Sequence, residues 1–271
     1  MKRIFTFGLL VAAAFALTNC AQKESYAPVQ EEVAETITLE IVAKLPADTK
    51  TYNEGMSTKW SADDQVRCIF TNQNGETDET DNPFNHEGNG KFVGKLEREF
   101  IRGFLSSFTG GTIKAMYPYE SNGTVPASTV QEGYDSMAHL AGANCPLEGT
   151  ITLSWNQNWL DLLFSQKYNL PELMLEHTTS VIEVAVKNST AAAINVNEVD
   201  FLVGGEVKAT TVVEKAGALA AGETALVYVV VEPGTYSDLS FTVNDKFVKD
   251  INAAEATFTA GKIKKVNFEV K

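Results

Sequence analysis

A run of alternating apolar residues at positions 36–43 constrains the fold more than any other feature of the chain. The residues that point to one side of an extended backbone there are Ile37, Leu39, Ile41 and Ala43. This period-two pattern predicts a half-buried β-strand. The residues that follow, up to Trp60, include a proline, an Asp-Thr pair and the isolated basic residue Lys50. They predict a short, polar and exposed segment, so the first strand could be detached from the fold.

Short strand-like runs continue along the chain, separated by turns rich in Gly, Pro, Asn and Asp. We predict these runs at residues 65–70, 91–96, 112–119, 151–155, 181–186, 194–203, 207–213, 224–231, 239–243, 256–259 and 263–270. The segment 125–144 is expected to be a loop, and 97–108 to hold a helical turn or two. No strand–helix alternation and no fixed-period repeat is visible. The sequence therefore predicts an all-β class with two β-sandwich domains, at residues 36–167 and 168–271.

The first residues resemble an export signal. A basic start, Met1-Lys-Arg, precedes the apolar run 4–17, which is shorter than the about 20 apolar residues that a membrane-spanning helix needs. The run ends in Leu-Thr-Asn-Cys at 17–20, which resembles a bacterial lipobox. We therefore predict a lipoprotein signal peptide at 1–19, cleavage between Asn19 and Cys20, lipid on Cys20, and a flexible tether at 20–35. The alternative is an ordinary signal peptide, because Asn19 departs from the small residue usual there.

The charge of the chain excludes two classes of partner. The formal net charge is −13, from 22 basic and 35 acidic residues. Nucleic-acid binding without sequence preference needs a cationic face, and so does electrostatic docking on an anionic bilayer. Any membrane attachment is therefore expected to be covalent, through Cys20.

Two further cysteines, Cys68 and Cys145, remain for the folded part. Export would permit a disulfide between them. Cys68 lies within a strand-like run, where a free buried cysteine behaves as a small hydrophobic residue, and this favours two unpaired thiols.

No sequence motif of a catalytic or cofactor site is present. The three histidines are His86, His139 and His177, far apart in sequence and expected to be packed or solvated. The oxygen ligands of Asp78, Glu79, Asp81 and Glu87 would allow a loose calcium site, but their spacing matches no EF-hand. Trp60, Trp155 and Trp159 would allow a sugar-stacking platform, but aromatic residues near strand ends more often pack in a core or at a sheet edge. The triplet Asp135-Ser136-Met137 makes Ser136 a candidate O-glycosylation site. We expect no enzyme, no metal and no cofactor.

The order of several motifs resembles the fimbrillins, the pilin-like lipoproteins of Bacteroidetes. In the first part of the chain these are the lipobox at Cys20, the alternating strand, Thr49-Lys50-Thr51, Trp60 and Asp64 before the run 66–70, and the pair of segments 90–94 and 115–119. Further along they are Val125-Pro126 with Gln131, residues 137–141, the start of a second domain at 173–188, and Ala260-Gly261-Lys262 before the last run. Each piece is loose alone, but their order extends over most of the chain.

The resemblance implies two transthyretin-like Greek-key domains and a lipoprotein delivered to the surface of the outer membrane. It also implies assembly by proteolysis-coupled strand exchange. In this family a trypsin-like protease cuts beyond the first strand, and a stalk subunit's strand fills the groove that opens, which is β-augmentation. The corresponding cut here would fall between Lys50 and Thr51, and the displaced strand would carry the apolar residues 37, 39, 41 and 43.

Two departures from the family pattern shape the expected role. Lys50 stands where the family has arginine, so cleavage would need a protease that tolerates lysine. The chain stops at Lys271, directly after its last expected strand, so it is expected to accept a donor strand and to give none. That suits a tip or accessory pilus subunit that binds a host or bacterial surface ligand. The alternative is a surface glycan-binding lipoprotein that does not polymerise.

Overall fold

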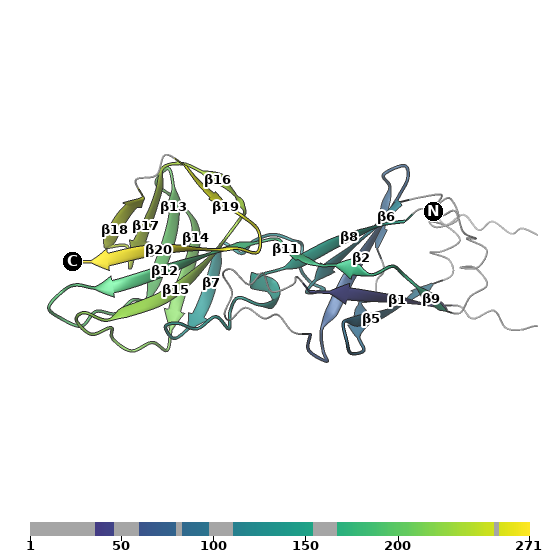
Figure 1. Ribbon diagram of the computed structural model, residues 1–271, viewed down its shortest axis with the longest axis horizontal. Coiled ribbons are helices and arrows are strands. Elements are labelled where there is room, and N and C mark those ends of the chain that lie inside the picture. The colour runs from purple at the N-terminus through teal and green to yellow at the C-terminus, as the bar shows by residue number, and fades with distance from the viewer. Residues whose placement is uncertain (1–35, 46–59, 80–82, 98–110, 154–166, 252–254) are drawn as a thin grey trace, which may run out of the picture. The chain divides into compact units, whose positions relative to one another are not determined.

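The computed structural model describes residues 36–45, 60–79, 83–97, 111–153, 167–251 and 255–271 (Figure 1). Within these ranges the chain is all-β, and the short 3-10 helix η2 (Gly142–Asn144) is the helical element. None of these residues belongs to a helix long and apolar enough to cross a membrane. The predicted all-β sandwich fold is confirmed.

The first sheet is built mainly from the first half of the chain. Its strands are β1 (Thr36–Lys44), β2 (Gln65–Asn72), β3 (Thr77–Glu79), β4 (Phe84–His86), β5 (Lys91–Glu97), β6 (Gly111–Tyr117), β8 (Leu147–Leu153), β9 (Lys167–Asn169), β10 (Leu173–Met174) and β11 (Glu176–His177). The strand order is β10-β1-β5-β4-β2-β6-β8-β11, with β3 paired to β2 and β9 paired to β1. Alternate residues of β1, β2 and β5 are buried, and they meet in one apolar core.

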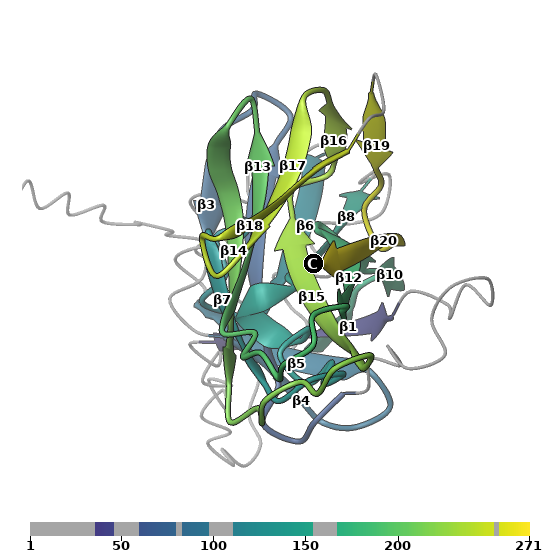
Figure 2. The same cartoon turned by 90° about the vertical axis from the view of Figure 1, so that its left-hand side faces the viewer.

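The second half of the chain forms three smaller sheets. Their strands are β12 (Ser180–Asn188), β13 (Glu198–Val203), β14 (Glu206–Glu214), β15 (Thr224–Val231), β16 (Gly234–Tyr236), β17 (Leu239–Val243), β18 (Phe247–Ile251), β19 (Ala256–Phe258) and β20 (Ile263–Val270). One sheet has the order β15-β12-β20, and a five-stranded sheet has the order β18-β17-β13-β14-β7, in which the edge strand β7 (Ser128–Glu132) comes from the first half of the chain. Strands β16 and β19 pair with each other. Figure 2 shows β13, β14, β17 and β18 side by side.

The buried faces of these sheets share a second apolar core. Valines of β12 and β15 supply one side, and aromatic rings supply much of the other. The ring of Phe201 lies edge-on to Phe258 at 5.5 Å between centroids and is tilted against Phe241 at 5.4 Å. Two sheets with apolar inner faces packed in this way form a β-sandwich.

One segment expected to be a loop contains a strand. Residues Ser128–Glu132 form β7, which pairs in parallel with β14 at the edge of the five-stranded sheet. The prediction of a loop at 125–144 was therefore wrong at these residues. The reason is that the inward-facing side chains of Thr129 and Gln131 are polar, so the strand has no apolar alternation. Gln131 is fully buried, and its amide group bonds the Leu226 carbonyl and the Tyr228 N–H of β15.

The expected division between residues 167 and 168 does not coincide with a change of sheet. Strands β9, β10 and β11 follow this point but belong to the first sheet, whereas β7 precedes it and joins the five-stranded sheet. The described residues belong to one compact unit. The two-domain boundary therefore stays a prediction.

Candidate functional site

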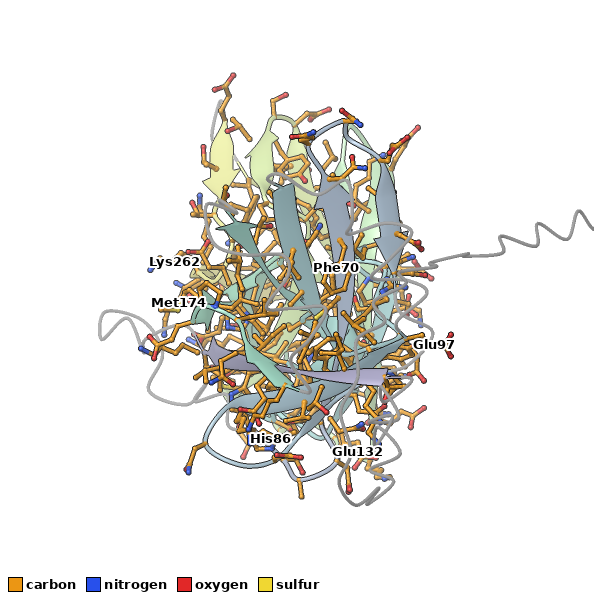
Figure 3. All side chains as sticks on the ribbon, turned by 90° about the vertical axis from the view of Figure 1, so that its right-hand side faces the viewer. Phe70, His86, Glu97, Glu132, Met174 and Lys262 are labelled. Atoms are coloured by element: carbon orange, nitrogen blue, oxygen red, sulfur yellow. The ribbon has the colours of Figure 1, made fainter. Side chains whose placement is uncertain are left out.

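Strand β1 lies inside the first sheet and has a neighbour on each side. It pairs antiparallel with β5 from Thr36 opposite Glu97 to Val42 opposite Lys91. On its other side it runs parallel to β9 and then to β10, where Lys44 lies opposite Met174. Glu97 and Met174 are labelled in Figure 3 and mark the two ends of β1. Loss of β1 would therefore open a groove with a hydrogen-bonding strand edge on both sides.

The apolar side chains predicted for β1 all enter the core. Ile37 and Ile41 are fully buried, and Leu39 and Ala43 are 2% exposed. Burying one large aliphatic side chain stabilises a fold by about 1.5 to 3 kcal/mol, so the three large ones contribute about 5 to 9 kcal/mol. The strand is therefore a main component of this core.

The opposite face of β1 is held by an ion-pair cluster around Glu40. Its carboxylate lies 2.8 Å from the Lys91 ammonium of β5 and 2.5 Å from the Lys167 ammonium of β9. The hydrogen bond from Lys167, followed by that from Lys91, lowers the pKa of Glu40. Because the two lysines come from the two flanking strands, Glu40 ties β1 to both sides of its groove.

The last residues of β1 are enclosed by a group that we call the β1 clasp: Trp60, Asp64, His86, Gly90 and Tyr117. The Ala43 N–H donates to the Gly90 carbonyl at 2.8 Å, and the Trp60 indole N–H donates to the Ala43 carbonyl at 3.3 Å. The Trp60 ring stands edge-on to Phe92 and Tyr117, with centroid distances of 4.8 and 5.2 Å. The clasp thus binds both backbone groups of Ala43.

Glycine is required at position 90 of the clasp. The residue has a φ of +73°, a region that L side chains rarely adopt. A Cβ atom there would also lie 2.5 Å from the Ala43 carbonyl oxygen. The turn between β4 and β5, which contains Gly90, can therefore approach β1 this closely because residue 90 has no side chain.

Hydrogen bonds tie the other members of the clasp together. The Asp64 carboxylate accepts from the Tyr117 hydroxyl at 2.8 Å and from the Ser61 N–H at 2.5 Å. Burial, together with this bond to Asp64, raises the pKa of Tyr117 to about 12. The His86 ring bonds the Ser61 carbonyl at 2.8 Å and accepts from the Gly90 N–H at 3.2 Å. The sequence does not indicate the clasp, because its members come from three separate segments, at residues 60–64, 86–90 and 117.

Several predicted site residues lie outside the described residues. They are Asn19, Cys20, Lys50, Thr51, Asp81, Trp155 and Trp159. The lipid anchor and the cleavage site therefore stay predictions. Trp60, the remaining member of the predicted sugar platform, is half-buried and belongs to the clasp.

Ser136, the candidate glycosylation site, is half-buried in the segment after β7. Its neighbour Asp135 has a φ of +63°, and the Asp135 carboxylate accepts from the Leu226 N–H at 2.8 Å. Met137 packs against the small apolar cluster of Leu140 and Cys145. Within the triplet, Asp135 therefore bonds to β15, and Met137 packs against an apolar cluster.

Cys68 and Cys145 are both buried and unpaired, which confirms the preferred sequence prediction. Burial raises the pKa of the Cys68 thiol well above its ordinary range and that of Cys145 to about 11. Both therefore stay protonated at neutral pH and are poor nucleophiles.

The three histidines have different surroundings. His86 belongs to the clasp, His139 contacts the Tyr228 carbonyl at 3.1 Å, and His177 lies on β11. Burial lowers the pKa of both His139 and His177.

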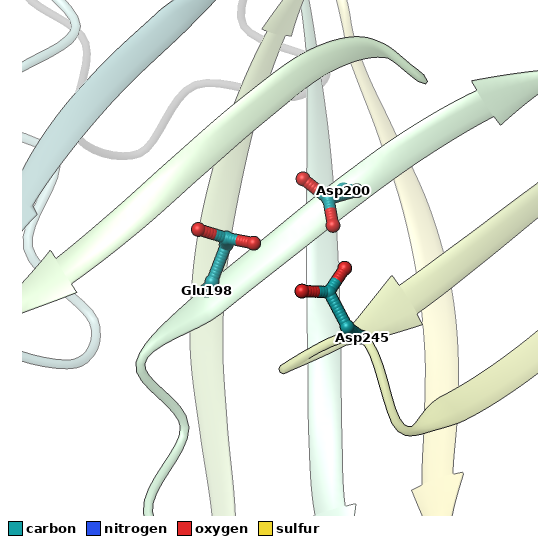
Figure 4. A group of neighbouring side chains, drawn as sticks. All are labelled: Glu198, Asp200 and Asp245. Carbon is teal, nitrogen blue, oxygen red and sulfur yellow. The ribbon is translucent and has the colours of Figure 1, made fainter. Parts of the chain in front are cut away.

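Of the loose calcium site considered from the sequence, Asp78, Glu79 and Glu87 are described, and they do not form a group close enough to share an ion. Among the described residues, the group close enough to share an ion is Glu198, Asp200 and Asp245 (Figure 4). Asp200 is 3% exposed, and its two oxygens accept from the hydroxyls of Thr210 at 2.6 Å and Thr242 at 2.8 Å. Burial, followed by the charges of Asp200 and Asp245, raises the pKa of Glu198. The group was missed because Asp245 is distant in sequence and follows another strand.

The comparisons with known proteins give structural neighbours only. No family model and no curated protein matches the chain. A candidate cell adhesion protein from Bacteroides ovatus is similar over 85% of this chain and 92% of its own, with 15% identity and a TM-score of 0.45. One from Bacteroides uniformis is similar over 86% of this chain and 93% of its own, with 16% identity and a TM-score of 0.42.

A fimbrial protein from Bacteroides ovatus is similar over 87% of this chain, with 14% identity and a TM-score of 0.40. This chain covers 50% of that protein's length. These neighbours are described as cell adhesion and fimbrial proteins. At such identities and TM-scores the likeness assigns neither a family nor an activity to the chain.

Proposed function

We propose that the chain is a fimbrillin-like surface lipoprotein with a structural or adhesive role, assembled by replacement of β1. Cys20 anchors it in the outer membrane, a trypsin-like protease cuts between Lys50 and Thr51, and a stalk subunit supplies a strand that fills the groove. The subunit stands at the tip of a fibre or as an accessory component. This role needs no catalytic residues.

The observation that carries the proposal is the position of β1. An apolar face that is 2% exposed or less fills the core, and hydrogen-bonding neighbours flank the strand on both sides. A groove of this kind recognises another strand through its backbone and through alternate side chains. An empty groove would be an apolar sheet edge prone to aggregation, so removal of β1 must be coupled to its replacement.

Limited proteolysis of the folded full-length chain tests the proposal. We expect a trypsin-like protease to produce a new N-terminus at Thr51, and Lys50→Ala to prevent this cut. The cut protein should then take up a fluorescent peptide of sequence TITLEIVAK, the sequence of β1. A control peptide with serine in place of its two isoleucines and its leucine should stay unbound. Complete cleavage without uptake of the first peptide would refute strand replacement.

The lipid anchor is tested separately. Cells grown with a clickable fatty acid should label the wild-type chain but not Cys20→Ser. The matched variant Cys68→Ser should keep its label, because Cys68 is buried in the core. Label on Cys20→Ser would refute the anchor.

A further inference from the structure

The clasp contains a histidine whose two ring nitrogens have opposite hydrogen-bonding roles. Nδ1 of His86 lies 2.8 Å from the Ser61 carbonyl oxygen, which can only accept, so Nδ1 carries the proton. Nε2 lies 3.2 Å from the Gly90 nitrogen, whose N–H can only donate, so Nε2 is unprotonated. The contacts therefore require the neutral ring with its hydrogen on Nδ1.

A second proton on His86 is incompatible with this arrangement. The imidazolium has two donors and no acceptor, so Nε2–H would face the Gly90 N–H, and the hydrogen bond between them would be lost. The Gly90 carbonyl is the group that accepts from the Ala43 N–H at the end of β1. Because a Cβ atom at position 90 would meet the Ala43 oxygen at 2.5 Å, the two backbones are in close contact, and a shift of Gly90 disturbs β1.

We propose that the His86–Gly90–Ala43 contact is an acid-sensitive latch, which holds the end of β1 when His86 is neutral and loosens it when His86 gains a second proton. This inference rests on the proposed function, since it concerns the conditions under which β1 can leave its groove. The affected end of β1 is the one that leads toward the predicted cut at Lys50.

The charged groups around the latch differ from His86 in their hydrogen-bonding capacity. They lie in the turn after Trp60, in the β4–β5 hairpin and on β1: Asp63, Asp64, Glu87, Lys91, Glu40 and Lys44. Lys91 pairs with both Glu40 and Glu87, Lys44 pairs with Glu172, and Asp64 bonds Tyr117. These side chains are carboxylates and ammonium groups, whereas the neutral imidazole ring of His86 has one donor and one acceptor and exchanges the acceptor for a second donor when it gains a proton.

Hydrogen exchange of the full-length labelled protein tests the latch. We expect the protection factor of the Ala43 amide to fall about fivefold between pH 7.5 and 5.5, the effect of losing one ordinary hydrogen bond. The Leu39 amide, in the middle of β1, should keep its protection factor within about twofold, because fraying of a strand end leaves its centre closed. The fall of the protection factor at Ala43 should be absent in the variant His86→Gln, because glutamine cannot titrate. The matched variant His177→Gln should keep it, because His177 lies on β11 outside the clasp.

A second measurement needs no variant. The ¹⁵N shifts of the His86 ring at pH 7.5 should show a protonated Nδ1 and an unprotonated Nε2. The opposite tautomer, a constant protection factor at Ala43, or the same pH response in His86→Gln would each overturn the latch. Peptide uptake by the cut protein at pH 7.5 does not involve a charged His86. Failure of the latch and failure of strand replacement are therefore separate results.

Discussion

Replacing Ile41 with alanine should destabilise the first sheet far more than the same change at Val42. Ile41 is fully buried on the core face of β1, opposite Phe92 in the register, whereas Val42 is half-buried on the other face. The change at Ile41 removes three buried carbons, worth about 2.4 kcal/mol at ~0.8 kcal/mol each. The cavity that remains brings the expected loss to about 3 to 4 kcal/mol. Replacing Val42 with alanine removes two half-buried carbons, so the expected loss of stability is about 0.8 kcal/mol.

Urea unfolding monitored by tryptophan fluorescence measures this difference. The three tryptophans stand at positions 60, 155 and 159, and the Trp60 ring contacts Phe92, so the emission follows the half of the chain that contains β1. The urea concentration at the unfolding midpoint should differ between the two variants. The slope of the unfolding free energy against urea concentration should stay constant, because the surface exposed on unfolding is nearly the same. Losses that agree within ~0.5 kcal/mol would refute the assignment of Ile41 to the core, since a change of that size is typical of surface positions.

Two further substitutions test the contacts of β1 and β5. In wild type, the lowered pKa of Glu40 gives a stabilisation that is present above the ordinary value of 4.5 and is lost as the pH falls through the folded-state value. Glu40→Gln should therefore flatten the fall of the unfolding free energy below pH 4.5, and an unchanged acid titration of stability would contradict the pairing with Lys91 and Lys167. Gly94→Ala would place a Cβ atom 2.7 Å from the fully buried Phe84 ring and should cost about 1 to 3 kcal/mol in thermal or urea unfolding. The cost should shrink in a Phe84→Leu background, and equal costs in both backgrounds would exclude the ring as its cause.

Strands with an apolar buried face were predictable from local pattern alone. The runs predicted at 224–231, 239–243 and 263–270 coincide with β15, β17 and β20. In each, hydrophobic residues occupy positions that an extended backbone turns toward the core. The same signal places Cys68 among the buried residues of β2.

Strands without that pattern were missed. β7 turns the polar Thr129 and Gln131 inward, and β18 is an edge strand whose residues are all at least partly exposed. In β7 the burial is stabilised by hydrogen bonds to β15, which hydropathy cannot show. Polar residues inside a fold depend on partners that only the folded chain provides.

For β1, the order of its residues already shows which side chains face the core, because alternation is a property of adjacent residues. The surroundings of the strand depend on the folded chain: β5 lies on one side, β9 and β10 lie on the other, and the clasp lies at Ala43. These neighbours come from segments up to about 130 residues away, and the period of a strand carries no information on which distant edge it will pair with. The strand was therefore visible in the sequence, whereas its groove and the histidine at its end became visible only in the fold.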